Sequence, residues 1–237
     1  MNANQQDGIQ RRDFLKTAAT AATALSILPA RTVFGFDANS KVELGITGCG
    51  GRGTWIGNLF EQHGNAKVVA VHDYFKDRTD RAREMFDLAP ERCHNDLEGH
   101  QALVAGSLDA VAVESPPYFH PEQAVATLDA GKHLYLAKPI AVDVPGCFSI
   151  EASGKRATEK KLCFLVDFQT RSQPFYQEAL KRVHAGAIGD FVFGEAYYHC
   201  GRLNTQQPKE GCEGRLRNWV FDQVLSVPLY AVSQMPR

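Results

Sequence analysis

A glycine-rich turn that directly follows a short β-prone run is the feature that most restricts how this chain folds. Residues 45–53, GITGCGGRG, hold five glycines in nine positions and come after Val42-Glu43-Leu44. Glycine adopts positive φ values and lets another backbone or a bound group approach closely. A strand that ends in such a turn and leads into a helix is typical of the first βαβ unit of a parallel sheet.

Short β-prone runs and segments of helical periodicity alternate after this turn, as expected for successive βαβ units. We expect strands at residues 42–47, 67–73, 110–114, 133–137 and 162–166. We expect helices at residues 51–63, 78–86, 121–130 and 145–158, two of them started by the proline-containing stretches HPEQ and DVPG. The pattern predicts an α/β fold with a Rossmann-type, doubly wound parallel sheet over residues 40–168.

The character of the sequence changes after Ala187-Ile188-Gly189-Asp190. Residues 191–198, FVFGEAYY, are aromatic and β-prone, and no helical pattern follows them. We therefore expect residues 169–237 to begin a second α/β domain, of which this chain contains only part.

The N-terminus resembles a twin-arginine export signal. Arg11-Arg12 precede a mildly apolar run at residues 17–30 that ends in Leu-Pro-Ala. We expect residues 1–30 to be a signal peptide and the protein to be exported to the periplasm. The alternative is a cytoplasmic amphipathic helix with two adjacent arginines. A run of this length is shorter than the ~20 apolar residues that span a membrane, so stable membrane insertion is not expected.

Charge and cysteine usage exclude several classes of function. The formal net charge is -1, with 26 basic and 27 acidic residues, so no nucleic-acid partner is expected and a small molecule is the default. The six cysteines form no C-x-x-C pair, which argues against a zinc ribbon or a redox dithiol and leaves a disulfide open. No histidine spacing indicates a metal site.

The positions of the glycines favour dinucleotide binding over a purely structural turn. In Gly48-x-Gly50-x-x-Gly53 the first glycine can make the tight turn, the second can admit a pyrophosphate, and the third can allow close helix packing. The helix N-terminus adds unpaired N–H donors. Asp73 ends the next strand 20 residues beyond Gly53, where a carboxylate can accept hydrogen bonds from a ribose.

The same carboxylate would repel a 2′-phosphate, so NAD is favoured as the cofactor. Arg52 and Arg78 can each meet a phosphate, and NADP therefore stays open. The alternative for both arginines is a solvated charge on a helix.

A second group of residues lies where ligands bind in open α/β sheets, at the carboxyl ends of two later strands. The loop SPPYFH, residues 115–120, follows one strand, and GKHLYLAKP, residues 131–139, contains the other. Lys138 can hydrogen-bond a substrate hydroxyl and favour its alkoxide character during hydride transfer. The alternative is a strand-end lysine that reaches into water.

These segments together resemble the Gfo/Idh/MocA family of nicotinamide-dependent oxidoreductases, which act mostly on sugars, inositols and related polyols. The resemblance rests on GCGGRG, the strand-end Asp73, SPPYFH, GKHLYLAKP and the run Phe168-Gln169-Thr170-Arg171, which occur in family order. It covers residues 42–219. The family commonly has Glu-Lys-Pro where this chain has Ala137-Lys138-Pro139.

The resemblance implies hydride transfer between NAD(P) and a hydroxyl carbon of a carbohydrate or polyol, with Lys138 at the substrate. His120 would lie on the nicotinamide side, although on the sequence alone it is as readily a histidine that begins a helix. The residues implied at the cofactor are Gly48, Cys49, Gly50, Gly51, Arg52, Gly53, Asp73, Ser115, Pro116, His120, Lys138 and Pro139.

The family also implies a longer second domain that holds substrate and commonly the oligomer interface. Only 66 residues follow Arg171, and residues 227–237 depart from the family pattern. We expect a frameshifted or prematurely ended chain that carries the homo-oligomer interface only in part. Two alternatives accompany the dehydrogenase: an NAD-dependent glycosidase of the same superfamily, and a catalytically inactive dinucleotide-binding fragment.

Overall fold

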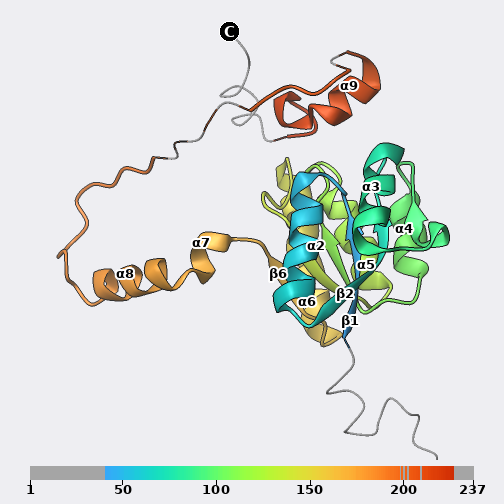
Figure 1. Cartoon of the computed structure of the whole chain (residues 1–237). Helices are drawn as coiled ribbons and strands as arrows, with labels where there is room; N and C mark the ends of the chain where they lie inside the picture. Colours follow the sequence, from blue (N-terminus) through green and yellow to red (C-terminus); the bar gives the residue numbers. More distant parts are fainter. Residues whose placement is uncertain (1–40, 198, 200, 202, 209, 227–237) are drawn as a thin grey trace, which may run out of the picture. The chain divides into compact units, whose positions relative to one another are not determined.

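A six-stranded parallel sheet forms the centre of the fold (Figure 1). The computed structural model describes residues 41–226 except 198, 200, 202 and 209, so the expected signal peptide lies outside the described residues. The spatial order of the strands is β3-β2-β1-β4-β5-β6. This is the order of a Rossmann sheet, and it confirms the predicted fold class.

The strands and helices alternate along the chain. β3 is the shortest strand, with two residues. The strands are β1 Val42–Thr47, β2 Ala66–His72, β3 Cys93–His94, β4 Ala110–Val113, β5 His133–Leu136 and β6 Phe164–Val166. The helices between them are α2 Gly51–His63, α3 Lys76–Phe86, α4 Gly99–Ala105, α5 His120–Asp129 and α6 Val144–Glu159, with a 3-10 turn at Pro90–Arg92.

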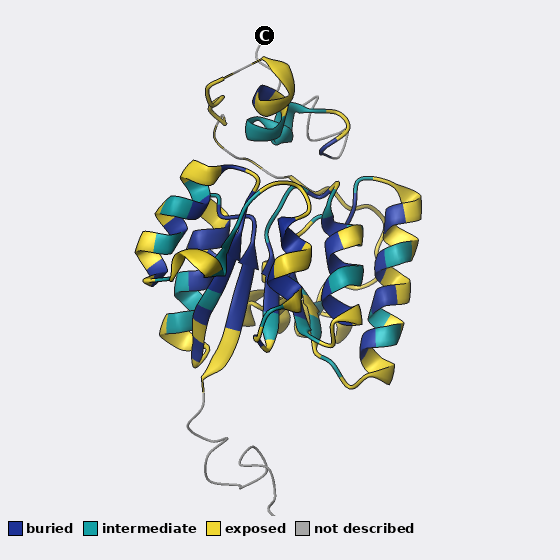
Figure 2. Cartoon of the chain, turned by 90° about the vertical axis from the view of Figure 1, so that its right-hand side faces the viewer, coloured by how far each residue is buried: buried dark blue, intermediate teal, exposed yellow. Residues whose placement is uncertain are grey.

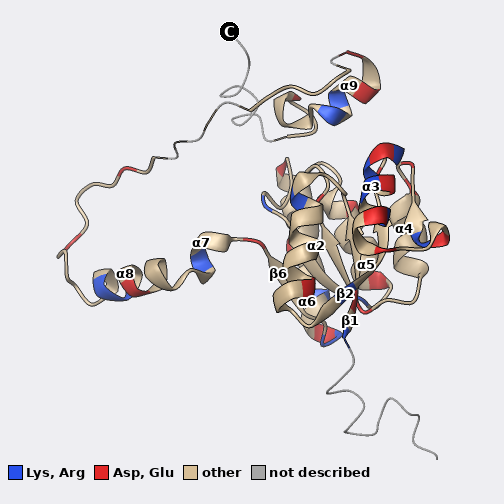
Figure 3. Cartoon of the chain, viewed as in Figure 1, with Lys and Arg blue, Asp and Glu red and all other residues tan. Residues whose placement is uncertain are grey.

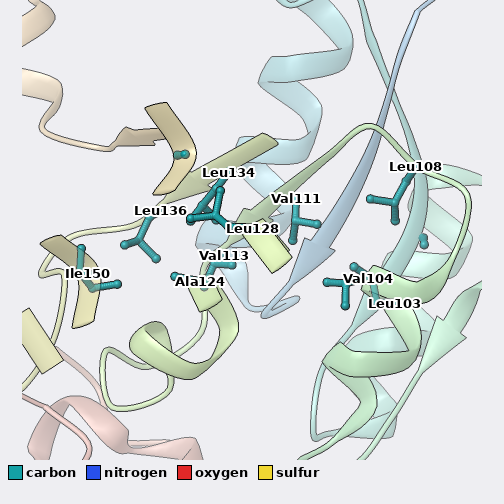
Figure 4. Close-up of a cluster of buried hydrophobic side chains, with 12 residues drawn as sticks. Leu103, Val104, Leu108, Val111, Val113, Ala124, Leu128, Leu134, Leu136 and Ile150 are labelled. Carbon is teal, nitrogen blue, oxygen red and sulfur yellow. The ribbon is translucent and has the colours of Figure 1, made fainter. Parts of the chain in front are cut away.

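Helices cover both faces of the sheet, and each face has its own apolar core. On one face α2 and α3 pack on residues such as Ile46, Val68 and Ala112. On the other face α4, α5 and α6 pack on the second cluster, whose side chains from strands and helices point toward one another in Figure 4. Figure 2 shows the strands as buried segments between helices that are exposed on their outer sides. Two packed faces explain why the strands are apolar on both sides.

The helices begin where the sequence supplies start signals. Asp143 is the N-cap of α6, and its Oδ1 accepts a hydrogen bond of 2.7 Å from the Gly146 N–H. Proline occupies the first turn of both α5 and α6, where its missing N–H costs no hydrogen bond. These are the two proline-containing stretches from which the sequence predicts helices.

One strand of the central pair carries an extra residue. Leu44 of β1 pairs with Val68 of β2, but its neighbour Gly45 pairs with Ala70, so Val69 has no partner in the register. Val68 and Val71 belong to the core under α2 and α3, whereas Val69 and Ala70 both pack on the opposite core. This β-bulge shifts the alternation of side chains by one position in the second half of β2.

The helices beyond β6 were not predicted from the sequence, and within the sheet domain two further elements, β3 and α4, were also missed. Both lie in the segment after α3, where β3 has only two residues and α4 only seven. Elements this short contain too few positions for a period to be read. The other differences are small: β6 begins at Phe164 rather than at residue 162, and α3 begins two residues earlier than predicted.

Beyond β6 the described residues contain helices and a 3-10 turn but no strand. These elements are α7 Gln169–Ser172, α8 Pro174–His184, α9 Gly211–Arg217 and the turn Trp219–Phe221. The β-prone run at Phe191-Val192-Phe193 is irregular and exposed, with Val192 97% exposed. No strand forms in this run, because a strand needs a neighbour to complete its backbone hydrogen bonds. The second domain expected at residues 169–237 stays a prediction. Across the described residues, no helix has both the length and the apolarity that crossing a bilayer requires.

Two glycines in the first turn of α2 differ sharply in the space around them, and this difference predicts opposite effects on stability. A Cβ at Gly53 would lie 1.9 Å from the Gly48 carbonyl oxygen, whereas a Cβ at Gly51 meets nothing within 4 Å. We expect Gly53→Ala to lower the free energy of unfolding by about 3 kcal/mol through overpacking.

Gly51→Ala is the matched control, and we expect it to leave stability unchanged or to raise it by up to ~1 kcal/mol through helix propensity. Urea unfolding of both variants and the parent measures the difference. Equal effects of the two substitutions would contradict the packing shown here.

Candidate functional site

A cavity of about 300 Å³ opens at the carboxyl ends of the strands. It lies where the strand order reverses between β1 and β4, the position at which open α/β sheets bind ligands. Its lining comes mainly from the turns that follow β1, β2, β3, β4 and β5, with Gln206, Leu216 and Trp219 contributed from farther along the chain. Among the residues expected at a cofactor, those that line it are Gly48, Gly50, Gly51, Arg52, Asp73, Ser115, Pro116 and Lys138.

The glycine turn is built by backbone contacts that a side chain would prevent. Gly48 has φ +94°, and its Cβ would lie 2.6 Å from the Ser115 backbone nitrogen. Gly50 is the N-cap of α2, and a Cβ there would meet only the end of Arg78, at 4.0 Å. Gly48 thus makes the predicted tight turn, Gly53 allows the predicted close packing, and Gly50 leaves open space at the helix N-terminus.

Asp73 fixes the turn from the end of β2. Its Oδ2 accepts a hydrogen bond of 2.8 Å from the Cys49 N–H, and its Oδ1 accepts one of 2.9 Å from the Phe75 N–H. Burial raises the pKa of Asp73, and the hydrogen bonds and the nearby Arg78 oppose this shift. Each carboxylate oxygen has a second lone pair, so Asp73 can also accept hydrogen bonds from a group in the cavity.

Cys49 contributes to this arrangement through its backbone. Its thiol is buried against the His72 carbonyl oxygen, and burial raises its pKa well above the ordinary value. The side chain does not line the cavity. Its expected cofactor contact is therefore indirect, since the Cys49 N–H holds Asp73.

His120 lies beneath the loops rather than in the cavity. It is 1% exposed, with Nε2 2.8 Å from the Ser115 carbonyl oxygen and Nδ1 2.9 Å from the Pro139 carbonyl oxygen. Burial lowers its pKa to about 4, so the ring is neutral at pH 7 and donates to one of the two oxygens. His120 thus connects the loop after β4 to the loop after β5, while the Ser115 hydroxyl donates to Gln123 Oε1 at 2.6 Å.

Arg52 lies between two carboxylates that the sequence did not identify as part of the site. Its Nε is 3.2 Å from Glu114 Oε2, and its Nη2 contacts Asp167 Oδ2. The Glu114 side chain is fully buried and lines the cavity. Burial raises the pKa of Glu114 to about 7 against the opposing effect of Arg52.

A second cavity, of about 360 Å³, lies beside the first. Arg52, Lys138, Gln206 and Trp219 line both. The second cavity adds Pro139 and polar side chains such as Asn204 and Asn218. Lys138 thus lies where two adjacent cavities meet.

Basic and acidic groups are mixed where the first cavity is lined by Asp73 and by residues of α3. Arg78 Nη1 is 3.9 Å from Asp73 Oδ2, and Arg78 also stacks on the Phe75 ring. Arg81 lines the cavity nearby. Figure 3 shows both charge signs interspersed along α3, so the cavity is not bounded there by a single sign of charge.

Metal-binding and disulfide chemistry find no support in the described residues. In the part of the chain that the structure describes, no group of three His, Cys, Asp or Glu side chains could hold a metal ion. The cysteines at positions 49, 93, 147, 163 and 212 are free, and the last three are exposed rather than buried as scattered thiols usually are.

Sequence reasoning missed Glu114, Asp167, Phe75 and Trp219, although a signal existed for the first two. Glu114 ends the apolar run AVAVE just as Asp73 ends VVAVHD. A charged residue that closes a buried strand lies at the ligand-binding edge of a parallel sheet. Asp167 carries the same signal after Phe164-Leu165-Val166.

Comparisons with known proteins agree with this geometry. A family model described as an oxidoreductase family with an NAD-binding Rossmann fold matches residues 42–168. A glycosyl hydrolase family 109 protein from Solibacter usitatus is 26% identical over 232 residues, which cover 90% of this chain and 51% of that protein. An α-N-acetylgalactosaminidase from Shewanella oneidensis is 27% identical, over 80% of this chain and 46% of that protein.

Among solved structures, scyllo-inositol dehydrogenase from Lactobacillus casei with bound NAD(H) and scyllo-inositol is similar to this chain. The TM-score is 0.54 at 27% identity, over 63% of this chain and 43% of that one. The chain spans about half the length of the curated relatives it matches.

The raised pKa of Glu114 predicts how one substitution changes the pH dependence of stability. A carboxyl with a folded pKa of about 7 against an ordinary 4.5 stabilises the folded state fully below pH 4.5, and this contribution is lost as pH rises through 7. Between about pH 5 and 8, the free energy of unfolding of Glu114→Gln should therefore rise by roughly 2 to 3 kcal/mol relative to the parent.

Glu84→Gln removes an exposed carboxylate from α3 and serves as the control. Its stability difference from the parent should not change with pH. Denaturant unfolding at several pH values checks both variants, and a pH-independent difference for Glu114→Gln would rule out a titrating buried carboxyl.

Proposed function

Because this chain belongs to the Gfo/Idh/MocA oxidoreductase family with an NAD-binding Rossmann fold, we propose that it transfers hydride between NAD and a hydroxyl carbon of a sugar or polyol. The observation that carries the proposal is the open space in front of Gly50 and Gly51, at the N-terminus of α2 and inside the cavity. Backbone N–H groups at a helix N-terminus favour a pyrophosphate there.

The residues present fit a dinucleotide. Gly48, Gly50 and Gly51 would hold the pyrophosphate, and Asp73 would accept hydrogen bonds from a ribose. Ser115 and Pro116 line the same cavity from the loop after β4. When bound, the nicotinamide supplies hydride chemistry that no protein side chain provides.

Lys138 would act on the substrate. It lies where the two cavities meet, and an ammonium donor there can hydrogen-bond a reacting hydroxyl and stabilise negative charge on its oxygen. The second cavity would receive the substrate, with Asn204, Asn218 and Trp219 as polar and aromatic contacts.

A second candidate function is an NAD-dependent glycosidase, which oxidises a sugar transiently and then eliminates its leaving group. The names of the curated relatives favour this candidate, because they describe glycosyl hydrolases and an α-N-acetylgalactosaminidase. The scyllo-inositol dehydrogenase similarity favours the dehydrogenase. A catalytically inactive dinucleotide-binding chain is the third interpretation. NADP stays an alternative cofactor, because Arg78 lies 3.9 Å from Asp73 and Arg52 lines the same cavity.

We also propose that the protein is exported to the periplasm. The twin-arginine pattern in residues 1–30 supports this location. The proposal also includes a carbohydrate or polyol as partner.

Substitution of the second motif glycine tests the cofactor site. We expect the full chain to bind NAD saturably in calorimetry and Gly50→Val to weaken binding more than about tenfold, because the side chain occupies the space of the pyrophosphate. Gly154→Val is the control, because a Cβ at that α6 glycine makes only ordinary contacts with Phe164. Absence of NAD binding by the folded parent would overturn the proposed function.

Substitution of Lys138 separates chemistry from cofactor binding. We expect Lys138→Met to lower turnover by about a hundredfold or more while the Kd for NAD stays within about threefold. The control is Lys132→Met, which removes an ammonium that donates to the Leu108 carbonyl oxygen.

Two assays identify the reaction. NADH formation with sugars and polyols reports the dehydrogenase, and nitrophenol release from a nitrophenyl N-acetylgalactosaminide without net NADH reports the glycosidase. Bound NAD with neither activity would leave the inactive interpretation.

A further inference from the structure

Glu114 is a buried acid in the wall of the cofactor cavity. It follows β4, where its side chain has no exposed surface. Neither of its oxygens has a hydrogen bond of good geometry within the described residues, and its near partner is the Arg52 ion pair at 3.2 Å. An acid that is buried without hydrogen-bond donors is held in its charged form only weakly.

Glu114 also packs against the glycine turn at which the proposed pyrophosphate would lie. A Cβ at Gly48 would lie 2.6 Å from the Glu114 carbonyl carbon, and a Cβ at Gly53 would lie 3.3 Å from Glu114 Cβ. The acid is therefore packed directly against the first turn of α2. Any charge that binds at this helix N-terminus changes the electrostatic potential at the Glu114 carboxyl.

We propose that Glu114 takes up a proton from solvent when a dinucleotide enters this cavity, so that cofactor affinity falls as pH rises through neutrality. The inference rests on the proposed function. In this role Glu114 sets the affinity for the cofactor and takes no part in hydride transfer.

The charges around Glu114 determine the direction in which dinucleotide binding shifts its protonation. Arg52, Glu114 and Asp167 together carry one positive and two negative charges when both acids are ionised. A bound pyrophosphate adds two negative charges and expels water from the cavity, and both effects favour the neutral carboxyl. Burial already raises the pKa of Glu114 to about 7, so a small further rise changes its charge near neutral pH.

Other titratable and charged groups face this region. Tyr135 on β5 interacts electrostatically with Glu114. The remaining ones that line the cavity are Arg52, His72, Asp73, Tyr74, Arg78, Arg81, Asp96 and Lys138, and Asp167 contacts Arg52. Asp73 is another acid that could take up the proton, because its pKa is also raised. An Asp73 variant is therefore compared with the Glu114 variant.

The test measures proton uptake directly. The full chain is titrated with NAD and with ADP-ribose by calorimetry near pH 7, in two buffers that differ in ionisation enthalpy. We expect a buffer-dependent heat that corresponds to uptake of a fraction of a proton for both ligands, because they share the pyrophosphate. If binding raises the pKa of Glu114 by about one unit, Kd should increase about fivefold between pH 6 and 8.

Variants assign the proton to its residue. Glu114→Gln should abolish the buffer dependence and flatten the pH profile, whereas Glu84→Gln should retain both. Asp73→Asn should weaken NAD binding through the lost ribose contact, but its heat of binding should still depend on the buffer. Arg52→Gln removes the cation that lowers the pKa of Glu114, and it should shift the midpoint of the pH profile upward; this variant keeps the test decisive if Glu114→Gln does not fold.

The outcomes separate this inference from the proposed function. Absence of saturable binding in every buffer would refute the proposed function and this inference with it. Binding without proton uptake, or with the same uptake in Glu114→Gln, would overturn the inference and leave the proposed function standing. Uptake with NAD but not with ADP-ribose would also overturn it, because the pyrophosphate would not be the cause.

Discussion

The structure depends on one backbone contact, the approach of the first turn of α2 to the turn that follows β1. The Gly48 carbonyl oxygen occupies the space in which a Gly53 side chain would lie, and Gly48 itself leaves no room against the backbone of Glu114 and Ser115. This contact brings a helix N-terminus, the ends of β1 and β4, and the side chain of Glu114 within a few ångströms of one another. A looser contact would leave the helix dipole farther from the cavity and the buried acid more hydrated.

The two ends of the cavity are electrostatically different. Near Asp73 the carboxylate accepts hydrogen bonds from two backbone N–H groups, which suits a hydrogen-bonding role. Near Glu114 the carboxylate has a guanidinium but no backbone donors, which suits a charge that changes. Two acids at equivalent strand ends therefore have different electrostatic surroundings because their hydrogen-bond donors differ.

The sequence was most informative where local periodicity and turn chemistry agree with the tertiary fold. The bounds of β1 and α2 were predicted to the residue, because an apolar strand, a glycine turn and an amphipathic helix follow one another without a break. The pair of short elements β3 and α4 had no such support. The contacts of Arg52 with Glu114 and Asp167 join residues more than sixty positions apart, and no local pattern specifies which charges meet across a sheet. The position of His120 beneath the loops is likewise a tertiary outcome, since its sequence context fits a helix start equally well.

The extra residue in β2 lengthens the sequence interval between the glycine turn and Asp73. Val69 and Ala70 both pack on the same core, and the alternation is restored in time for Asp73 to reach the Cys49 N–H. A chain without the bulge would place its acid on the same side of the sheet with one residue fewer between glycine turn and carboxylate. The interval between these two motif elements therefore contains one residue of irregular strand in addition to α2 and the regular part of β2, and it would be one residue shorter without the bulge.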